Sequence, residues 1–316
     1  MSKIFDDMTQ LVGNTPMVRM DRFAKNHGAK ANIVAKLECF NPAGSSKDRV
    51  AAQMVLDAEK DGRIKPGATI IEPTSGNTGV GLAFIASLRG YKSIFVMPET
   101  MSIERRKLLS AYGAEIVLTE AAKGMAGSIE KANELNQQIP DSIILQQFEN
   151  PSNPKAHYNT TAEEIWRDTD GRVDVVIAGV GTGGTICGTA KRLKELNPNI
   201  KAIAIEPYSS QVLAGKAAGA HKIQGIGANF VPGNYNGSVI DEVFPVKDDD
   251  AILAARQLAT QEGMLVGISA GAVASAAVEI SKRPEFQNKN IVVILPDSGE
   301  RYLSTYLYDF DGYPLK

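Results

Sequence analysis

Nearly continuous apolar segments of strand length alternate with longer segments of helical periodicity along most of the chain. The predicted strands are residues 32–37, 68–72, 93–97, 115–119, 142–146, 173–180, 202–206 and 291–296. The predicted helices are residues 48–59, 78–88, 102–112, 124–138, 154–167, 185–196, 248–262 and 270–281. Apolar strands separated by helices are typical of parallel sheets that are covered on both faces. The pattern therefore predicts an α/β fold.

Turn-forming residues cluster at positions 149–154, between two such series of strands and helices. This cluster indicates a boundary between two domains. Two domains suit a chain of 316 residues, because one domain usually has roughly 100 to 200 residues. The net charge of −2 and the scattered basic residues give no basic stripe, so the sequence predicts neither a nucleic-acid partner nor an anionic membrane surface.

The cysteines and histidines predict neither a disulfide framework nor a metal site. Cys39 and Cys187 lie far apart, and the three histidines form no cluster at ligand spacing. No apolar run approaches the roughly 20 residues of a membrane span, and the first ten residues contain no signal-peptide core. We expect a reduced, cytoplasmic protein.

Lys47 stands where the helix 48–59 is predicted to begin, and Ser45 or Ser46 could cap that helix. A helix N-terminus is electropositive, so the pKa of this lysine should lie below its ordinary value of about 10.4. Such a lysine can form a Schiff base or act as a base. The alternative is a solvated lysine in the first turn.

A first loop, residues 73–79, follows a strand and opens a helix. Its glycines and hydroxyl groups would let several backbone N–H groups converge on a carboxylate or a phosphate. The alternative is a capped turn in which glycine serves the backbone geometry.

A second loop, residues 179–185, also joins a strand to a helix. Gly179, Gly181 and Gly184 match the G-x-G-x-x-G pattern, and Glu206 ends the next strand, where a dinucleotide fold has a ribose-binding acid. A dinucleotide-dependent oxidoreductase is therefore an alternative. It leaves Lys47 and the first loop without a role, whereas threonine hydroxyls in the second loop suit a terminal phosphate. We favour a phosphate monoester.

A third loop, residues 267–271, matches the G-x-S-x-G nucleophile elbow of hydrolases around Ser269. No histidine follows Ser269, so the hydrolase triad lacks its base. Ser269 could instead donate to a ring nitrogen or cap the helix 270–281. A lysine suited to an imine, sites for a phosphate and a carboxylate, and this hydroxyl together predict pyridoxal 5′-phosphate and an amino-acid substrate.

At these residues the chain resembles the cysteine synthases, or O-acetylserine sulfhydrylases, of the β-family (fold type II) of pyridoxal-phosphate enzymes. The resemblance runs from end to end through residues 13–16, 41–49, 74–79, 97–102, 147–148, 181–185, 224–227 and 296–302. Ala270, Asn229 and Met17 depart from the family pattern and bear on fine substrate preference only.

The resemblance implies a role for each matching residue. Lys47 corresponds to the Schiff-base lysine, Asn77 to the residue at the cofactor's ring hydroxyl, and Ser269 to the partner of the pyridine nitrogen. The implied phosphate loop is Gly181, Thr182, Gly183, Gly184 and Thr185. The implied substrate-binding residues are Thr74, Ser75, Gly76, Asn77, Thr78, Gln147 and Gly225.

The resemblance also implies an architecture and a reaction. The fold would be like that of tryptophan synthase β, with a smaller α/β domain at residues 37–149 and a larger one at residues 1–36 and 150–316, each with a mostly parallel sheet. The activity would be replacement of acetate in O-acetyl-L-serine by sulfide, through an α-aminoacrylate intermediate, in a homodimer. An O-phosphoserine sulfhydrylase or a cystathionine β-synthase-like enzyme is an alternative, and the C-terminal peptide of serine acetyltransferase is an implied partner.

Overall fold

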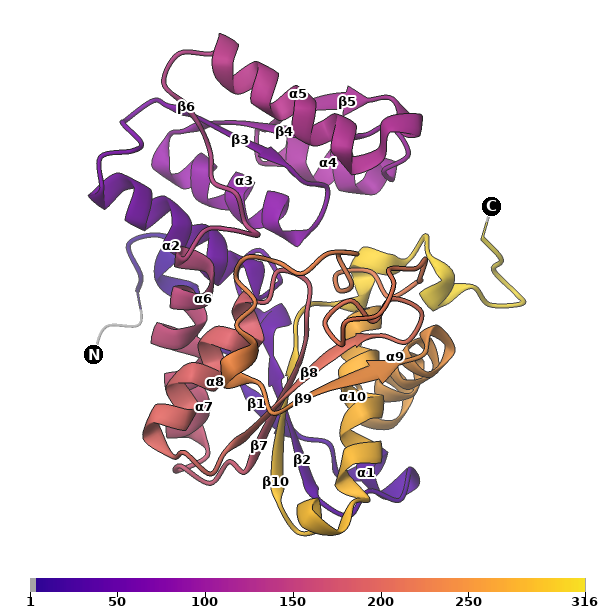
Figure 1. Cartoon of the computed structure of the whole chain (residues 1–316). Coiled ribbons are helices and arrows are strands. Elements are labelled where there is room, and N and C mark those ends of the chain that lie inside the picture. The colour runs from indigo at the N-terminus through magenta and orange to yellow at the C-terminus, as the bar shows by residue number, and fades with distance from the viewer. Residues whose placement is uncertain (1–3, 316) are drawn as a thin grey trace. The chain divides into compact units, whose positions relative to one another are not determined.

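The computed structural model describes residues 4–315, which pack into two compact units (Figure 1). The described part of the first unit is residues 4–12 and Asn41–Asn153, and that of the second is Gly13–Phe40 and residues 154–315. The sequence-based boundaries, after residues 36 and 149, stay a prediction for the domains, because compact packing does not test independent folding.

The first unit has a four-stranded parallel sheet in the order β5-β4-β3-β6. Its strands are β3 (Thr69–Pro73), β4 (Lys92–Pro98), β5 (Glu115–Thr119) and β6 (Ser142–Ile144). Its helices are α2 (Lys47–Lys60), α3 (Asn77–Arg89), α4 (Ile103–Ala111) and α5 (Gly124–Gln138). Ile70 packs with residues of α2 and α3, whereas its neighbour Ile71 packs with Ala132 of α5. Helices therefore cover both faces of the sheet (Figure 1).

The second unit has a six-stranded sheet in the order β1-β2-β10-β7-β8-β9. Its strands are β1 (Met17–Arg19), β2 (Asn32–Leu37), β7 (Val175–Gly179), β8 (Lys201–Pro207), β9 (Glu242–Val246) and β10 (Asn290–Leu295). Only β1 runs antiparallel to its neighbour among the described strands of this sheet. The N-terminal strands thus complete a sheet whose other strands come from the C-terminal half.

Helices cover both faces of the second sheet as well (Figure 1). They are α1 (Asp21–Asn26), α7 (Ala162–Asp168), α8 (Gly184–Leu196), α9 (Asp248–Glu262) and α10 (Ile268–Ser281). Helix α6 (Ser152–Ala156) and a π-helical turn (His157–Thr161) precede α7. Short 3-10 segments lie at Met8–Leu11, Glu38–Phe40, Ala121–Lys123, Gly237–Val239, Pro284–Phe286, Gly299–Tyr302 and Tyr306–Tyr308.

The predicted α/β class with mostly parallel sheets is confirmed, and the differences concern two edge strands and two helical segments. The pattern did not predict β1, α1 or β9. The two strands are edge strands, and most of their residues are partly exposed, so they lack the continuous apolar run of a central parallel strand. The predicted helix 154–167 is interrupted by the π-helical turn, which hydrophobic spacing does not reveal.

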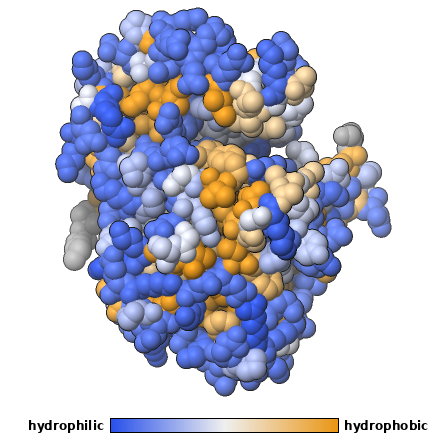
Figure 2. Space-filling model, in the orientation of Figure 1, coloured by the Kyte–Doolittle hydropathy of each residue, from blue (hydrophilic) through white to orange (hydrophobic). Residues whose placement is uncertain are grey.

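On the face in Figure 2, hydrophilic residues predominate, and apolar residues gather in smaller patches. Within residues 4–315 no helix is both long and apolar enough to cross a membrane. The same residues hold no group of three or more His, Cys, Asp or Glu side chains that could bind a metal ion.

Candidate active site

Lys47 is the first residue of α2 and is half-buried. The Ser45 hydroxyl accepts the Lys47 backbone N–H at 3.2 Å, whereas the Ser46 side chain makes no capping bond. The buried Asp48 carboxylate accepts the Ala43 N–H at 2.6 Å. These local bonds fold the segment back on itself, so Ser45 rather than Ser46 caps the helix that begins with Lys47.

Helix α2 approaches α3 closely at Lys47. A Cβ atom on Gly81 would lie 2.9 Å from the Lys47 carbonyl oxygen and 3.1 Å from the Ala51 Cβ, which leaves no room for a side chain. Gly81 lies just over one turn after Asn77, the first residue of α3. The packing therefore brings the start of α2, with Lys47, beside the first turn of α3.

Hydrogen bonds within the first unit join the first loop to Gln147 and to Arg105. The Thr78 hydroxyl donates to Gln147 Oε1 at 2.5 Å. The Gly76 N–H donates to the Thr74 hydroxyl at 3.3 Å, and Arg105 donates to the Ser75 carbonyl at 3.0 Å. This unit thus gathers Thr74, Ser75, Gly76, Asn77, Thr78 and Gln147 around the electropositive N-terminus of α3, an arrangement suited to a carboxylate.

The second loop joins β7 to α8, and Gly181 and Gly183 within it leave no room for a side chain. Gly183 precedes α8 with a φ of +82°, and a Cβ there would lie 2.9 Å from the Tyr235 Cα. A Cβ on Gly181 would lie 2.3 Å from the Gly225 carbonyl oxygen. Helix first turns expose backbone N–H groups that have no partner within the helix. The loop thus combines glycines, threonine hydroxyls and a helix N-terminus, features that suit a phosphate, and Gly225 packs against it.

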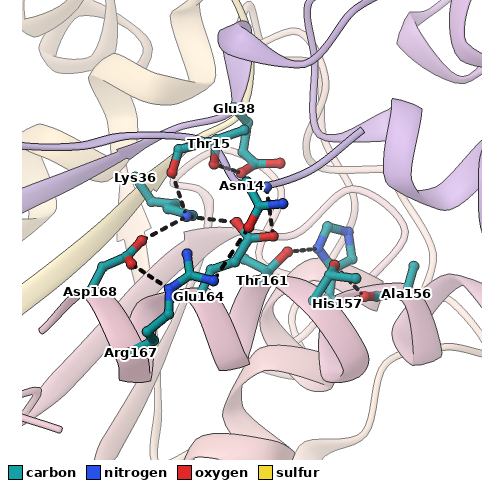
Figure 3. A network of polar contacts seen from close by, with 11 residues as sticks. Asn14, Thr15, Lys36, Glu38, Ala156, His157, Thr161, Glu164, Arg167 and Asp168 are labelled. Carbon is teal, nitrogen blue, oxygen red and sulfur yellow. Dashed lines mark hydrogen bonds and ion pairs between the residues drawn. The ribbon is translucent and has the colours of Figure 1, made fainter. Parts of the chain in front are cut away.

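His157 supports this loop, a role that no sequence motif indicates. Its buried ring contacts the Thr185 hydroxyl through Nε2 at 3.1 Å and the Thr161 hydroxyl through Nδ1 at 2.9 Å. Figure 3 shows the ring directed toward Thr161 in the π-helical turn. His157 and Thr185 are 28 positions apart, so no local motif links them.

Ser269 is the second residue of α10 and is buried, and Gly267 occupies the N-cap position. The alternative prediction that Ser269 caps this helix is therefore wrong. A Cβ on Gly225 would lie 3.8 Å from the Ser269 hydroxyl oxygen, so the second unit brings Gly181, Gly225 and Ser269 together. His27, His157 and His221 all bond to residues other than Ser269, which disfavours a hydrolase triad at Ser269.

Glu206 does not present its carboxylate as a ribose-binding acid would. It is buried at the end of β8, and its oxygens accept the backbone N–H groups of Leu213 at 2.9 Å and Ala214 at 3.3 Å. Burial raises the pKa of this carboxyl group. The geometry disfavours the dinucleotide alternative.

The residues of both units fit pyridoxal phosphate. A lysine at a helix start can bind an aldehyde covalently, and a glycine-rich loop that opens α8 suits a phosphate. The buried Ser269 hydroxyl can serve a ring nitrogen.

Comparisons with known proteins also indicate a pyridoxal-phosphate dependent enzyme. Residues 8–297 match the model of the pyridoxal-phosphate dependent enzyme family. Cysteine synthase A of Escherichia coli K12 is 51% identical over 98% of this chain and 97% of its own. A cysteine synthase of Staphylococcus aureus is 49% identical over 98% of this chain and 99% of its own. The structure of a cysteine synthase from Entamoeba histolytica superposes with a TM-score of 0.95, at 46% identity over 98% of this chain and 92% of that one.

Proposed function

The chain belongs to the family of pyridoxal-phosphate dependent enzymes, and we infer from this membership and its relatives that it is a cysteine synthase. It replaces the acetate of O-acetyl-L-serine by sulfide and yields L-cysteine and acetate. This conclusion rests on the similarity to cysteine synthases, which extends over almost the whole chain. Neither the related β-replacement reactions nor the dinucleotide alternative is favoured.

We propose that the first unit supplies the reacting lysine and the substrate-carboxylate site. Lys47 would bind the cofactor covalently, and Asn77 would contact the ring hydroxyl. Thr74, Ser75, Gly76, Asn77, Thr78 and Gln147 would bind the carboxylate of the amino acid. The hydrogen bond between Thr78 and Gln147 and the position of Asn77 at the start of α3 support this assignment.

We propose that the second unit supplies the phosphate loop. Gly181, Thr182, Gly183, Gly184 and Thr185 would bind the phosphate through backbone N–H groups and hydroxyls, and the Ser269 hydroxyl would meet the ring nitrogen. Gly225 would lie at the substrate side chain. The close packing of Gly181 on Gly225, and of Gly225 near Ser269, supports this grouping.

Bound pyridoxal phosphate supplies an electron sink for the α-carbon of an amino acid. Lys47 would hold the cofactor, and its Nζ would remove the α-proton of the bound substrate as acetate leaves the β-carbon with its bonding electrons. Once sulfide has taken the place of acetate on the β-carbon, Lys47 Nζ would return the proton to the α-carbon. Holding the substrate carboxylate in the first loop would orient the α-proton toward Lys47, and such orientation can lower a barrier by several kcal/mol.

Borohydride reduction of the purified protein followed by peptide mapping tests the Lys47 assignment. We expect the pyridoxyl label on Lys47 and loss of the visible cofactor absorbance in Lys47→Ala. Lys60, at the exposed end of the same helix, is the matched control, and Lys60→Ala should keep both label and absorbance. A label on another lysine would overturn the assignment.

The donor is tested by turnover with sulfide and one donor at a time. O-acetyl-L-serine should be used far more efficiently than O-phosphoserine or serine. A clear preference for either of the latter would replace the proposed donor.

We also propose a homodimer, binding of the C-terminal peptide of serine acetyltransferase, and a cytoplasmic location. Exposed apolar side chains at Ile4, Phe5, Met8 and Leu11 support a surface that another chain covers. Light scattering after size exclusion tests the dimer, and a monomeric mass would exclude it. Titration with the peptide against turnover tests the second partner.

A further inference from the structure

Glu72 is a fully buried carboxylate at the point where two strands separate. It lies near the end of β3, whose pairing with β6 stops at Ile71 and Ile144. The backbone N–H groups of Leu145 and Gln146 donate to Glu72 Oε2, and that of Gln147 donates to Oε1, each at 3.1 Å. The Glu72 side chain thus accepts the N–H groups of three successive residues, in place of the backbone hydrogen bonds between two strands.

The ionised form of Glu72 matches this environment, because the three described partners are donors. Burial opposes ionisation, and the balance raises the pKa of Glu72 to about 7. Hydrogen bonds to a charged acceptor are stronger than those to a neutral one. Above neutral pH the carboxylate therefore holds the 145–147 backbone firmly.

Further hydrogen bonds hold the backbone on both sides of Gln146. The Gln147 carbonyl accepts the Asn153 side-chain amide at 2.8 Å, and the Leu145 carbonyl accepts that of Asn150 at the same distance. Gln146, between them, has a left-handed φ of +58°, a conformation that costs energy unless neighbouring bonds enforce it. The backbone of Gln147 is thus anchored through both its N–H and its carbonyl.

The Gln147 side chain is oriented as well. Its Oε1 accepts the Thr78 hydroxyl at 2.5 Å, and this bond distinguishes the oxygen end of the amide from the NH₂ end. An NH₂ group is a donor that suits a carboxylate. Backbone anchoring by Glu72 and side-chain orientation by Thr78 therefore act on the same amide.

We propose that Glu72 is a positioning residue for substrate binding, which acts by holding the backbone of Gln147 so that its amide meets the carboxylate of the amino-acid donor. This inference rests on the proposed function, since it takes Gln147 as part of the substrate-carboxylate site. Glu72 itself touches no substrate.

The second unit provides a matched control. Glu206 also precedes a proline at the end of a strand, is buried, and accepts two backbone N–H groups of the segment that follows. Its partners, Leu213 and Ala214, are not among the proposed substrate-binding residues. Glu206→Gln therefore removes a similar buried carboxylate without disturbing Gln147.

The test compares Glu72→Gln with Glu206→Gln at about pH 8, where the Glu72 carboxyl is mostly ionised. Glutamine keeps the shape of glutamate but replaces one acceptor by a donor, so part of the hold on residues 145–147 is lost. We expect faster amide hydrogen exchange at Leu145, Gln146 and Gln147 and a KM for O-acetyl-L-serine raised about tenfold, with kcat changed less than about threefold. Glu206→Gln should leave that KM within about twofold.

A double-mutant cycle separates positioning from general destabilisation. Because Glu72 acts through Gln147, adding Glu72→Gln to Gln147→Ala should raise KM little further. Fully additive effects, an unchanged KM despite faster exchange, or an equal rise in Glu206→Gln would each overturn the proposal. Glu72→Asp, which keeps the charge on a shorter stem, should lie between wild type and Glu72→Gln.

Two measurements on the unsubstituted protein complete the test: amide hydrogen exchange, and an assay of cofactor binding and turnover. Slow exchange at the amides of residues 145–147 is expected, and fast exchange there would refute the proposal even if no Glu72 variant folds. Failure of the proposed function would look different. In that case the wild-type protein itself would lack cofactor on Lys47 or turnover of O-acetyl-L-serine, while the exchange results would stand.

Discussion

Lys36 Nζ lies 2.7 Å from Glu164 Oε2, and the Lys36 side chain is fully buried. Lys36 also donates to the Thr15 carbonyl at 2.7 Å and lies 3.8 Å from Asp168 Oδ2. Figure 3 shows these groups converging between β2 and α7 within the second unit. The charge of this lysine is thus compensated inside the protein rather than by water.

Lys36→Met should destabilise the protein strongly. Removing one member of a buried ion pair leaves the other charge in a poorly solvating interior, at a cost of about 3 to 5 kcal/mol. Lys282 and Glu279 form a comparably short but exposed pair, for which Lys282→Met should cost less than about 1 kcal/mol. Denaturant unfolding measures both. Equal losses of unfolding free energy in the two variants would show that burial does not determine how much the Lys36 pair stabilises the protein.

Gly81→Ala should disturb the start of α2. The new methyl group would lie 2.9 Å from the Lys47 carbonyl oxygen, so the two helices must separate, at a cost of about 1 to 3 kcal/mol. We expect a lower melting temperature and a weaker cofactor absorbance, because Lys47 moves. In Gly237→Ala the new methyl would meet the Tyr235 ring at an ordinary 3.7 Å, and that variant should resemble wild type. A Gly81→Ala variant with unchanged stability would refute the steric argument.

Gly181→Ala should impair cofactor binding specifically through the phosphate. The methyl group would lie 2.3 Å from the Gly225 carbonyl oxygen, which forces the second loop to move. Fluorescence titration of the cofactor-free protein should show weaker binding of pyridoxal phosphate, with less change for pyridoxal. An equal loss for both ligands would argue that the loop does not hold the phosphate.

Glu72 should make stability depend on pH in a definite direction. Burial raises its folded-state pKa to about 7 from 4.5. A carboxyl group with a raised pKa holds its proton more tightly in the folded chain, so its contribution is full below about pH 4.5 and is lost as the pH rises through about 7, by on the order of 3 kcal/mol. The Glu72→Gln variant should show no such loss of stability as the pH rises. If unfolding of wild type and variant responds identically between about pH 5 and about pH 8, the carboxyl does not titrate as described.

The central strands and most of the candidate site were predictable because their signals are local. Short segments of sequence are enough to indicate a helix that begins near Lys47, glycine loops after strands, and Ser269 near a helix start. Glu72 was visible only as the end of an apolar strand, since its partners lie 73 to 75 positions away. His157 likewise bonds across the fold. Such side-chain bonds depend on how strands are placed side by side, which spacing along one strand does not reveal.

Strand β2 pairs along its whole length with β10, from Asn32 with Asn290 to Leu37 with Leu295, and β10 lies between β2 and β7. During synthesis, the second sheet therefore stays incomplete until β10 has left the ribosome. Most of the first unit is one continuous stretch, Asn41–Asn153, and can assemble earlier. A nascent chain thus carries β2 with an unpaired edge for most of its elongation, and this exposed edge is where premature association with other chains would begin.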